Sequence, residues 1–496
     1  MKTFAKPPEF IHDSSTRPGR IHFGPLNCWT NDPAGLVYCD GLYHMFFQVN
    51  PGGTSWGNIH WGHTVSRDLV NWQMRPLAIT PHPELGLAFT GSVVVDSENS
   101  SGLFPERRDG FVAFLTTASP VPGQDRYTQT QSIAYSRDRG ETWQWHSDNP
   151  VIPDQSARDF RDPKVFRDEE RSRWCAVISR GQSVSFYASV NLLEWWHLST
   201  SDLPAVPDVC ECPDLIRMDY RGGYVWVLFY SVSHDSRGLG SGVRYQLGSF
   251  DGVRFVPDVP RKQGGRVFDV GFDHYALQSW YGLPDSDGPV TISWANNSAY
   301  AHDLPAVYRG VNGMMTVPRL LELAETETGL TLVQRPAIVL DEAADTRMPA
   351  LDCGSGCLQF LPTDSGPFYV MLRGGSEQVS YLQIEISCYN GFYLDIHLDF
   401  NAGEISARRT APKLDTPEMD SRHLMPSPAR PVECLVLMDR GIVELFLNGG
   451  TAAATYQIFD EGTPVELKVK SPGAPGTIEV TACRVEQPKR SIKKEV

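Results

Sequence analysis

The chain has 496 residues, which exceeds the size of one ordinary domain, so we expect two or more hydrophobic cores. Its formal net charge is −15, and 41% of its residues are hydrophobic. This acidic balance argues against nucleic acid or an anionic membrane as the main partner, and no apolar run reaches the length of a membrane span. A neutral polar substrate suits such a protein.

Five strand-like segments in the first 300 residues begin on a small polar or acidic residue. Their first residues are Asp32, Ser92, Asp162, Glu211 and Asp273. These starts lie 60, 70, 49 and 62 residues apart. Such recurrence is typical of a radial repeat, in which each unit adds one blade around a common axis. If each residue heads the innermost strand of its blade, the five side chains converge on one end of the channel.

The segments after each start favour hairpins. The turn Asp40-Gly41, for example, separates the strand-like runs 35–38 and 43–48. A second recurring unit, made of a strand, a polar turn and an aromatic residue, follows in the outer half of each repeat. Four strands per repeat and five repeats predict an all-β chain whose residues 18–325 form a five-bladed β-propeller.

A different β pattern follows the predicted propeller. We expect a linker over 326–344 and a C-terminal β-sandwich over 345–486, because hydrophobic and polar residues alternate with a period of two between short turns. The basic residues 487–496 are interpreted as a solvated tail.

Three of the starts are carboxylates that each stand next to or near a proline. Taken singly, Asn31-Asp32-Pro33, Arg161-Asp162-Pro163 and Glu211-Cys212-Pro213 are most simply turns. Their common position in the repeats indicates more, because three carboxylates in one site suit acid–base chemistry on a glycosidic bond. One carboxylate would act as nucleophile and one as acid, while a third would bind hydroxyl groups and balance positive charge. The residues alone leave open which is which.

Tryptophans near the starts have two interpretations. Trp29, Trp56, Trp61 and Trp294 either stack on sugar rings or pack in the core. We find no phosphate-binding glycine loop, no nucleophilic serine elbow and no paired metal-ligand motif. The sequence therefore predicts no cofactor and no metal.

Several segments resemble those of one known family, among them the runs 56–63 and 66–72. The run from Trp29 to Gly35, with Asp32 at its centre, the run Phe160-Arg161-Asp162-Pro163 and the run Glu211-Cys212-Pro213 resemble three signatures of glycoside hydrolase family 32, which holds invertases, inulinases, levanases and fructosyltransferases. The runs 313–319 and 443–448 are similar to further segments of that family. The resemblance thus covers most of the chain in order.

This resemblance implies a retaining β-fructofuranosidase that acts on sucrose or short fructans. Asp32 would be the nucleophile, Glu211 the acid/base and Asp162 the transition-state stabiliser. The residues expected to contact the sugar are Asn31, Gln48, Trp56, Ser92, Arg161 and Trp294. No nucleic acid, membrane or cofactor is implied, and a homodimer is compatible with the pattern.

Several alternatives stay open at this point. Within the family, a fructosyltransferase, an exo-inulinase or a levanase would carry the same carboxylates. Thr30 and Ala34, beside the nucleophile, differ from the family's usual residues, which leaves open whether water or a sugar accepts the fructosyl group. A five-bladed arabinan- or xylan-cleaving enzyme is disfavoured by the three motifs. A binding propeller without turnover is disfavoured because a scaffold has no need to crowd negative charge.

The compartment is predicted from two features. Residues 1–15 lack the apolar segment of a secretory signal, and ten cysteines are too few for a disulfide scaffold. We therefore expect a cytoplasmic protein with reduced thiols, or a secreted one if a leader segment has been removed.

Overall fold

The structure is a computed structural model in which nearly all regular structure is β-strand. The residues it describes are 21–25, 27–106, 109–124, 126–153, 159–203, 209–233, 240–258, 265–302, 311–326, 329–339, 346–347, 351–353, 356–360, 367–374, 379–411, 419–424, 432–439, 441–459, 465–471, 476–485 and 489–490. Within these ranges the only helices are short 3-10 turns, and none of them is long and apolar enough to span a membrane.

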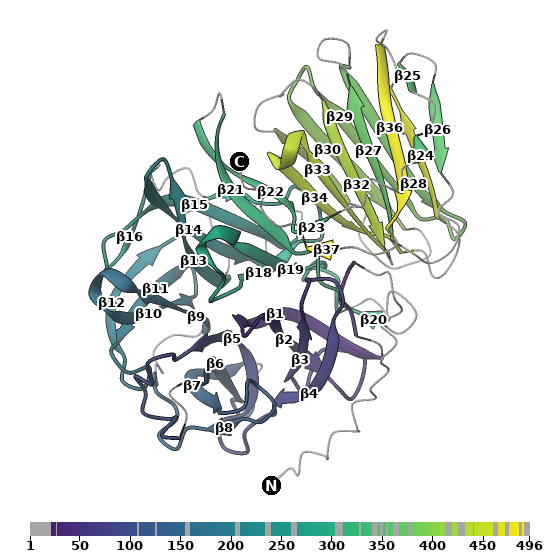
Figure 1. Ribbon diagram of the computed structural model, residues 1–496. Coiled ribbons are helices and arrows are strands. Elements are labelled where there is room, and N and C mark those ends of the chain that lie inside the picture. Colours follow the sequence, from purple (N-terminus) through teal and green to yellow (C-terminus); the bar gives the residue numbers. More distant parts are fainter. Residues whose placement is uncertain are drawn as a thin grey trace.

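The N-terminal part contains five antiparallel sheets that follow one another along the chain (Figure 1). The first holds β1 (Cys28–Cys39), β2 (Leu42–Asn50), β3 (His60–Ser66) and β4 (Gln73–Ile79), with β20 (Val311–Asn312) parallel to β1. The second holds β5 (Leu87–Val95), β6 (Phe111–Pro120), β7 (Tyr127–Ser136) and β8 (Gln144–Trp145). The third holds β9 (Phe160–Asp168), β10 (Arg173–Arg180), β11 (Ser183–Ser189) and β12 (Trp196–Asp202).

The remaining two sheets continue this order. The fourth holds β13 (Cys210–Tyr220), β14 (Gly223–Val232), β15 (Gly242–Phe250), β16 (Phe255–Pro257) and β17 (Arg266–Val267). The fifth holds β18 (Tyr275–Ser279), β19 (Val290–Trp294), β21 (Arg319–Thr326) and β22 (Gly329–Pro336). The first strands of the sheets contact one another in turn, β1 to β5, β5 to β9, β9 to β13, β13 to β18 and β18 back to β1. This arrangement is that of a β-propeller, with the first strands innermost.

Every first strand carries a β-bulge at the same place. Two of its residues oppose a single residue of the second strand, after which the pairing resumes. The bulged pairs are Asn31–Asp32, Phe89–Thr90, Asp162–Pro163, Cys212–Pro213 and Ala276–Leu277. A bulge bends a strand and redirects side chains, so one end of the ring presents residues that a regular strand would turn away.

The bulges show that the five predicted starts do not occupy equivalent positions in their repeats. The three carboxylates occupy three successive positions rather than one: Glu211 precedes its bulge, Asp162 is the first bulged residue and Asp32 is the second. In the second sheet, Thr90 rather than Ser92 is equivalent to Asp32. In the fifth sheet, Tyr275 rather than Asp273 is equivalent to Glu211.

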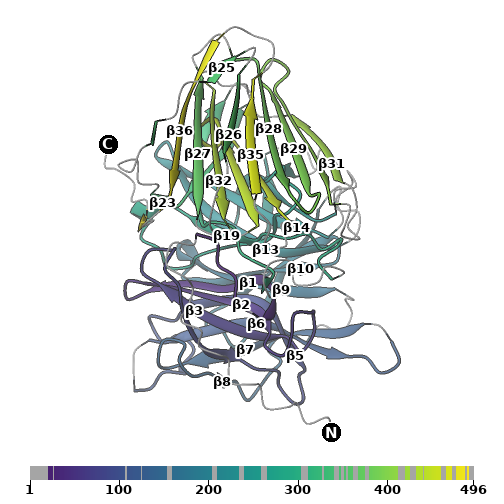
Figure 2. The same cartoon turned by 90° about the vertical axis from the view of Figure 1, so that its right-hand side faces the viewer.

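The C-terminal part is a β-sandwich (Figure 2). One sheet has the order β24 (Thr346–Arg347), β36 (Gly476–Arg484), β27 (Phe368–Gly374), β32 (Glu433–Asp439), β33 (Ile442–Leu447) and β34 (Ala452–Gln457), with β25 (Leu351–Cys353) also on β36. The other has the order β26 (Cys357–Phe360), β35 (Val465–Lys470), β28 (Tyr381–Cys388), β29 (Tyr393–Asp399), β30 (Glu404–Thr410) and β31 (Met419–Leu424). Buried and half-buried residues alternate along β28 and β29, as the sequence predicts, because one face of each strand packs into the core between the sheets.

Short strands occupy the segments expected to be a linker and a tail. Strand β22 lies in the fifth propeller sheet, so that sheet continues beyond residue 325 to Pro336. Strand β23 (Ile338–Val339) pairs with β37 (Lys489–Arg490), which places two residues of the basic tail against the predicted linker.

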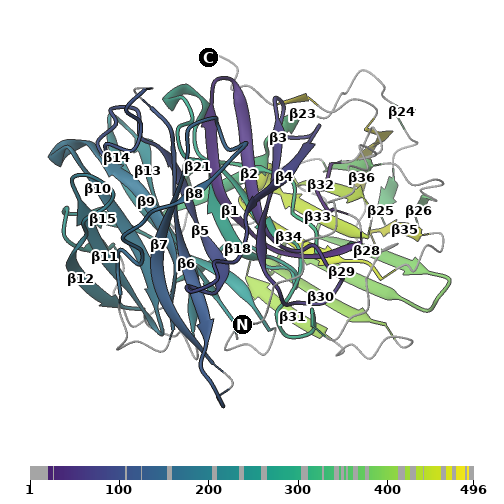
Figure 3. The same cartoon turned by 90° about the horizontal axis from the view of Figure 1, so that it is seen from below.

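The two parts meet along β34, and Figure 3 shows them side by side from below. Residues 269–273 run beside this strand, with hydrogen bonds from the Val270 amide to the Ala453 carbonyl and from the Asp273 amide to the Thr455 carbonyl. Asp273 was expected to face the channel, but its carboxylate instead accepts hydrogen bonds from Arg409, Tyr300 and the Gln457 amide of the interface.

Candidate active site

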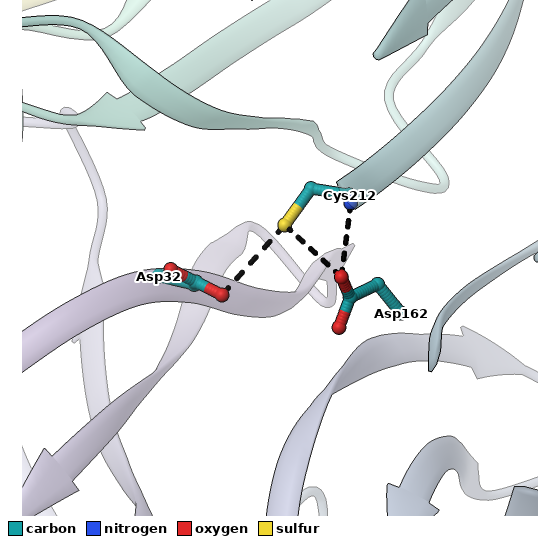
Figure 4. Close-up of side chains that lie close together, drawn as sticks. All are labelled: Asp32, Asp162 and Cys212. Carbon is teal, nitrogen blue, oxygen red and sulfur yellow. Dashed lines mark hydrogen bonds between the residues drawn. The ribbon is translucent and has the colours of Figure 1, made fainter. Parts of the chain in front are cut away.

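The bulges bring two of the three predicted carboxylates to one point beside a thiol. Asp32 Oδ2 and Asp162 Oδ2 each lie 3.7 Å from Cys212 Sγ (Figure 4). The Cys212 amide also donates a hydrogen bond of 3.0 Å to Asp162 Oδ2. Asp162 and Cys212 both have φ in the left-handed region, at 61° and 47°, which fits their places in the bulges. These residues belong to three sheets, so the closure of the ring gathers them.

Asp32 is held by a closed circuit of polar side chains. Thr90 Oγ1 donates to Asp32 Oδ2 at 2.6 Å, and Asn31 Nδ2 donates to Asp32 Oδ1 at 3.2 Å. Asn31 Nδ2 also donates to Gln48 Oε1 at 3.1 Å, and Gln48 Nε2 donates to the Thr90 hydroxyl. Trp29 Nε1 fixes the Asn31 amide through a bond of 2.8 Å to Oδ1. Each Asp32 oxygen therefore has a side-chain donor, with the Cys212 thiol as a second one on Oδ2, and the orientation of the carboxylate is set.

Burial and mutual repulsion change the protonation of these groups. Burial raises the pKa of Asp32 to about 6, with the charge of Glu211 adding to this rise and the Thr90 hydroxyl opposing it. Burial and the Glu211 charge likewise raise the pKa of Asp162, although Arg161 opposes the rise. Burial, together with the carboxylates beside it, raises the pKa of the Cys212 thiol well above its ordinary value. The thiol is therefore neutral, and both aspartates titrate near neutral pH rather than near pH 4.

Glu211 lies between donors from the two neighbouring sheets. Arg161 Nε donates to Glu211 Oε1 at 2.9 Å, and the Tyr275 hydroxyl donates to Oε2. Arg161 is fixed in turn by Asp159, at 2.9 Å, and by Gln129, at 3.2 Å. The Glu211 side chain keeps 24% of its surface exposed, whereas Asp162 is buried. Glu211 is thus oriented on both oxygens and still reaches solvent.

Aromatic rings lie next to this group. Trp56 is half-buried, and its ring meets those of Phe89, Tyr127 and His302 edge to face at 6.2–6.3 Å. His302 also stacks on Trp29, with ring centroids 5.2 Å apart.

Two predicted sugar contacts are more deeply placed. Trp294 is buried and packs against Trp29 at 5.8 Å. Ser92 is also buried, and its hydroxyl donates to the Pro163 carbonyl and accepts from the Val165 amide, both at 2.9 Å. Ser92 therefore joins the second sheet to the third and has no donor hydrogen left for a sugar.

The unusual residues beside Asp32 both have buried side chains. Ala34 is fully buried in a cluster that includes Phe46 and Val93, and Thr30 is fully buried as well. Thr90, two residues before Ser92, does reach the carboxylates, because its hydroxyl donates to Asp32.

Sequence reasoning missed three residues of this group. Thr90 lies two residues before Ser92, which was predicted in its place. Cys212 was considered only as part of the motif Glu211-Cys212-Pro213, and Tyr275, two residues after Asp273, was given no role. The bulge register is the signal that identifies them, and it is visible only once strands are paired.

Ligand atoms of Asp32, Asp162 and Cys212 lie within 4.8 Å of one another, a spacing that a metal ion could use. The absence of a metal stays a prediction.

A cavity of about 600 Å³ opens farther along the same strands, and none of the predicted site residues lines it. Its wall includes Lys164, Asp214 and Trp280. Lys164 Nζ lies 2.9 Å from Asp214 Oδ2, and this buried ion pair comes two to three residues after Asp162 and Glu211 in their strands.

Comparisons with known proteins agree with these features. Residues 22–336 match the model "Glycosyl hydrolases family 32 N-terminal domain", and residues 353–486 match "Glycosyl hydrolases family 32 C terminal". A levanase of Bacillus subtilis is 39% identical over 68% of this chain, and the match spans about half (49%) of that levanase. An extracellular exo-inulinase of Aspergillus niger is 32% identical over 94% of this chain and 93% of its own length.

Solved structures give the same result. The exo-inulinase of Aspergillus awamori superposes with a TM-score of 0.82 at 30% identity, over 96% of this chain and 99% of that one. A β-fructofuranosidase of Schwanniomyces occidentalis, complexed with fructosyl-erythritol, superposes with a TM-score of 0.81 at 28% identity, over 96% and 98% of the two chains.

Proposed function

The chain belongs to glycosyl hydrolases family 32, and we propose that it is a retaining β-fructofuranosidase that hydrolyses terminal β-D-fructofuranosyl bonds of sucrose and short fructans. The observation that carries the proposal is the convergence of Asp32, Asp162 and Glu211 from three separate sheets. Burying and crowding carboxylates costs free energy, which a purely structural ring end would avoid.

The first step forms a covalent intermediate. Ionised Asp32 attacks the anomeric carbon of the fructosyl unit, the bond from that carbon to the glycosidic oxygen breaks, and Glu211 gives its proton to that oxygen. The donors from Thr90 and Asn31 hold the Asp32 oxygens in place for the attack. The leaving sugar departs with the proton, and the fructosyl group stays as an ester of Asp32.

The second step releases fructose. Glu211, now ionised, takes a proton from a water molecule whose oxygen attacks the same carbon, and the ester bond to Asp32 breaks. Both Asp32 and Glu211 return to their starting protonation. Because the attack occurs from the opposite face each time, the configuration at the anomeric carbon is retained.

Asp162 and its neighbours bind the fructosyl ring in this proposal. Asp162 accepts hydrogen bonds from sugar hydroxyls and offsets the positive charge of the transition state. Asn31, Gln48 and Arg161 border the carboxylates and would contact the sugar. Trp56 lies at the edge of the group and supplies an apolar face to the ring.

The relatives named above favour hydrolysis over transfer. They are a levanase, exo-inulinases and a β-fructofuranosidase, so the choice among sucrose, inulin and levan is a difference within one activity. The side chains of Thr30 and Ala34 are fully buried, which is in keeping with this choice of water as acceptor.

We also propose that the propeller has five blades, one for each N-terminal sheet. The ring of contacts among β1, β5, β9, β13 and β18, and the parallel pairing of β20 with β1, support this number. The first domain would then extend to Pro336, and the sandwich would begin near residue 346.

Two substitutions test the proposal on sucrose, inulin and levan. Asp32→Ala should abolish release of fructose, and Glu211→Gln should slow it by about 10²–10⁴-fold, the usual effect of losing a general acid. Glu84→Gln, on an exposed turn, is the matched control and should leave the rates unchanged. Chromatography also separates hydrolysis from transfer, since transfer would release less fructose than glucose from sucrose. Wild-type rates in both variants would refute the proposal.

A further inference from the structure

The bulge register places Arg161, Glu211 and Tyr275 at equivalent positions in three successive sheets. Each is the last regularly paired residue before the bulge of its strand: Arg161 pairs with Ser179, Glu211 with Ser231 and Tyr275 with Trp294. Since neighbouring first strands contact each other, equivalent residues lie next to one another around the ring. Glu211 therefore has Arg161 on one side and Tyr275 on the other.

Each neighbour uses one oxygen of Glu211. Arg161 Nε donates to Oε1, and the Tyr275 hydroxyl donates to Oε2. A carboxylate with only one fixed donor can rotate about its last side-chain bond, whereas donors on opposite oxygens fix its plane. Glu211 is nonetheless partly exposed, so the carboxyl group that these donors fix still reaches solvent.

Tyr275 is suited to hold this position throughout turnover. It is buried, and its ring packs in a cluster with Trp29, Trp294 and Cys212. Burial and the adjacent Glu211 charge raise the pKa of Tyr275 well above its ordinary value, so the phenol keeps its proton and stays a donor. Its strand begins immediately after residues 269–273, which are bonded to the sandwich, so the backbone before the ring is anchored.

From this geometry we propose that Tyr275 is a positioning residue that orients Glu211 for proton transfer to the glycosidic oxygen. The inference rests on the proposed function of Glu211 as acid/base. Tyr275 itself exchanges no proton with the substrate. Its hydroxyl fixes the plane of the carboxyl group, so that the oxygen that carries the proton faces the leaving sugar.

The test compares two leaving groups. Sucrose has a poor leaving group that needs the proton of Glu211, whereas 4-nitrophenyl β-D-fructofuranoside has a good one that departs without it. Tyr275→Phe removes only the hydroxyl, and it should lower kcat for sucrose by about 10–100-fold, a part of the full effect of a general acid. On the aryl fructoside, the burst of nitrophenol measures the rate constant for fructosyl transfer to Asp32. This rate constant should fall less than about 3-fold, because the nitrophenol leaves without a proton from Glu211.

Matched variants separate positioning from a structural role. Tyr245→Phe removes another buried hydroxyl, 3.1 Å from Thr331 Oγ1, and should leave both substrates unaffected. In a Glu211→Gln background, Tyr275→Phe should cause no further loss on sucrose, because it acts through Glu211. Circular dichroism and the thermal midpoint establish folding, and Tyr275→His replaces Tyr275→Phe if the latter does not fold.

The outcomes are distinct. Equal losses on both substrates, no loss on sucrose, or a loss that multiplies with that of Glu211→Gln would overturn the positioning role. If the wild-type chain releases no fructose from any fructoside, the proposed function fails instead, and the comparison of variants is not reached.

Discussion

A buried arginine of the propeller joins several groups at the interface with the sandwich. Arg319 is fully buried and donates to Asp269 at 2.8 Å, to Gln334 at 2.6 Å and to Thr455 at 2.7 Å, and it also binds Glu444. His22 Nε2 lies 2.8 Å from the other oxygen of Glu444. We predict that Arg319→Met destabilises the protein strongly, because it leaves Asp269 without its guanidinium partner and Glu444 with only His22 and the Val317 amide.

The size of the effect follows from the protonation of Glu444. Burial alone would raise the pKa of this group, but Arg319 and His22 outweigh burial and lower the pKa from 4.5 to about 2. At about 1.4 kcal/mol per pH unit, this difference corresponds to about 3 kcal/mol of stabilisation of the ionised side chain. Removing one partner of a buried ion pair typically costs about 3–5 kcal/mol, and we expect a loss in that range at pH 7.

The sign of the pH dependence gives a second readout. A carboxyl group with a lowered pKa contributes its stability above pH 4.5 and loses it as the pH falls toward 2. In Arg319→Met this contribution is smaller, and Glu444 can take up a proton at a higher pH than in the wild type. The difference in unfolding free energy between the two proteins should therefore be largest at pH 7 and shrink toward pH 4.

Urea unfolding, followed by tryptophan fluorescence and by circular dichroism, measures this difference where the two signals coincide. Arg335→Met is the matched control, because Arg335 is half exposed and pairs with Glu322 at 3.2 Å on the surface. It should cost less than about 1 kcal/mol. A loss below about 1 kcal/mol for Arg319→Met at pH 7, or one that grows on acidification, would refute the reasoning.

Two further predictions concern the nucleophile and the domain contact. Burial raises the pKa of Asp32 to about 6, and Asp32 must be ionised to attack, so kcat/KM for sucrose should fall as the pH drops through about 6. Thr90→Val removes a donor that opposes this rise, so the acid limb of the pH profile of kcat/KM should move to higher pH. Thr90→Ser keeps the hydroxyl and should keep the wild-type profile. An unmoved acid limb in the valine variant would contradict the role of Thr90. A methyl group on Gly271 would lie 2.1 Å from the Thr455 carbonyl oxygen, so Gly271→Ala should lower stability by about 1–3 kcal/mol. Gly53→Ala, with open space around it, should change stability by less than about 1 kcal/mol in the same unfolding assay, and equal effects of the two would count against the close approach.

The sequence predicted the architecture well because hydrophobic alternation and turn residues act locally. The turn at Asp40-Gly41 joins β1 and β2 as expected, and the alternating runs 381–386 and 393–398 lie within β28 and β29. The limits of the parts were less visible. Strand β22 extends the fifth sheet as a hairpin with β21, past the predicted end of the propeller, and β37 forms by pairing with the distant β23.

The prediction named the three carboxylates of the candidate site and only part of their surroundings. Three acidic residues near prolines can be read from the sequence, and Asn31 and Gln48 were also named. Ser92 and Asp273 were each assigned a position two residues away from the one that the bulge register makes equivalent, and composition does not reveal that register. Thr90 and Tyr275 are identified only when strands of different sheets are placed side by side.

The same register links the sandwich to the chemistry of the propeller. Asp273 is bonded to Arg409 and to the Gln457 amide of the sandwich, and Tyr275 follows two residues later with its hydroxyl on Glu211. Two residues of extended chain span only about 7 Å, so a shift of the sandwich would displace Tyr275 unless the intervening backbone absorbed it. The backbone has little freedom there, because the Ala276 amide is bonded to Ser231 Oγ at 3.0 Å in the neighbouring sheet. The sandwich is thus part of what fixes the orientation of Glu211, although it supplies none of the three carboxylates.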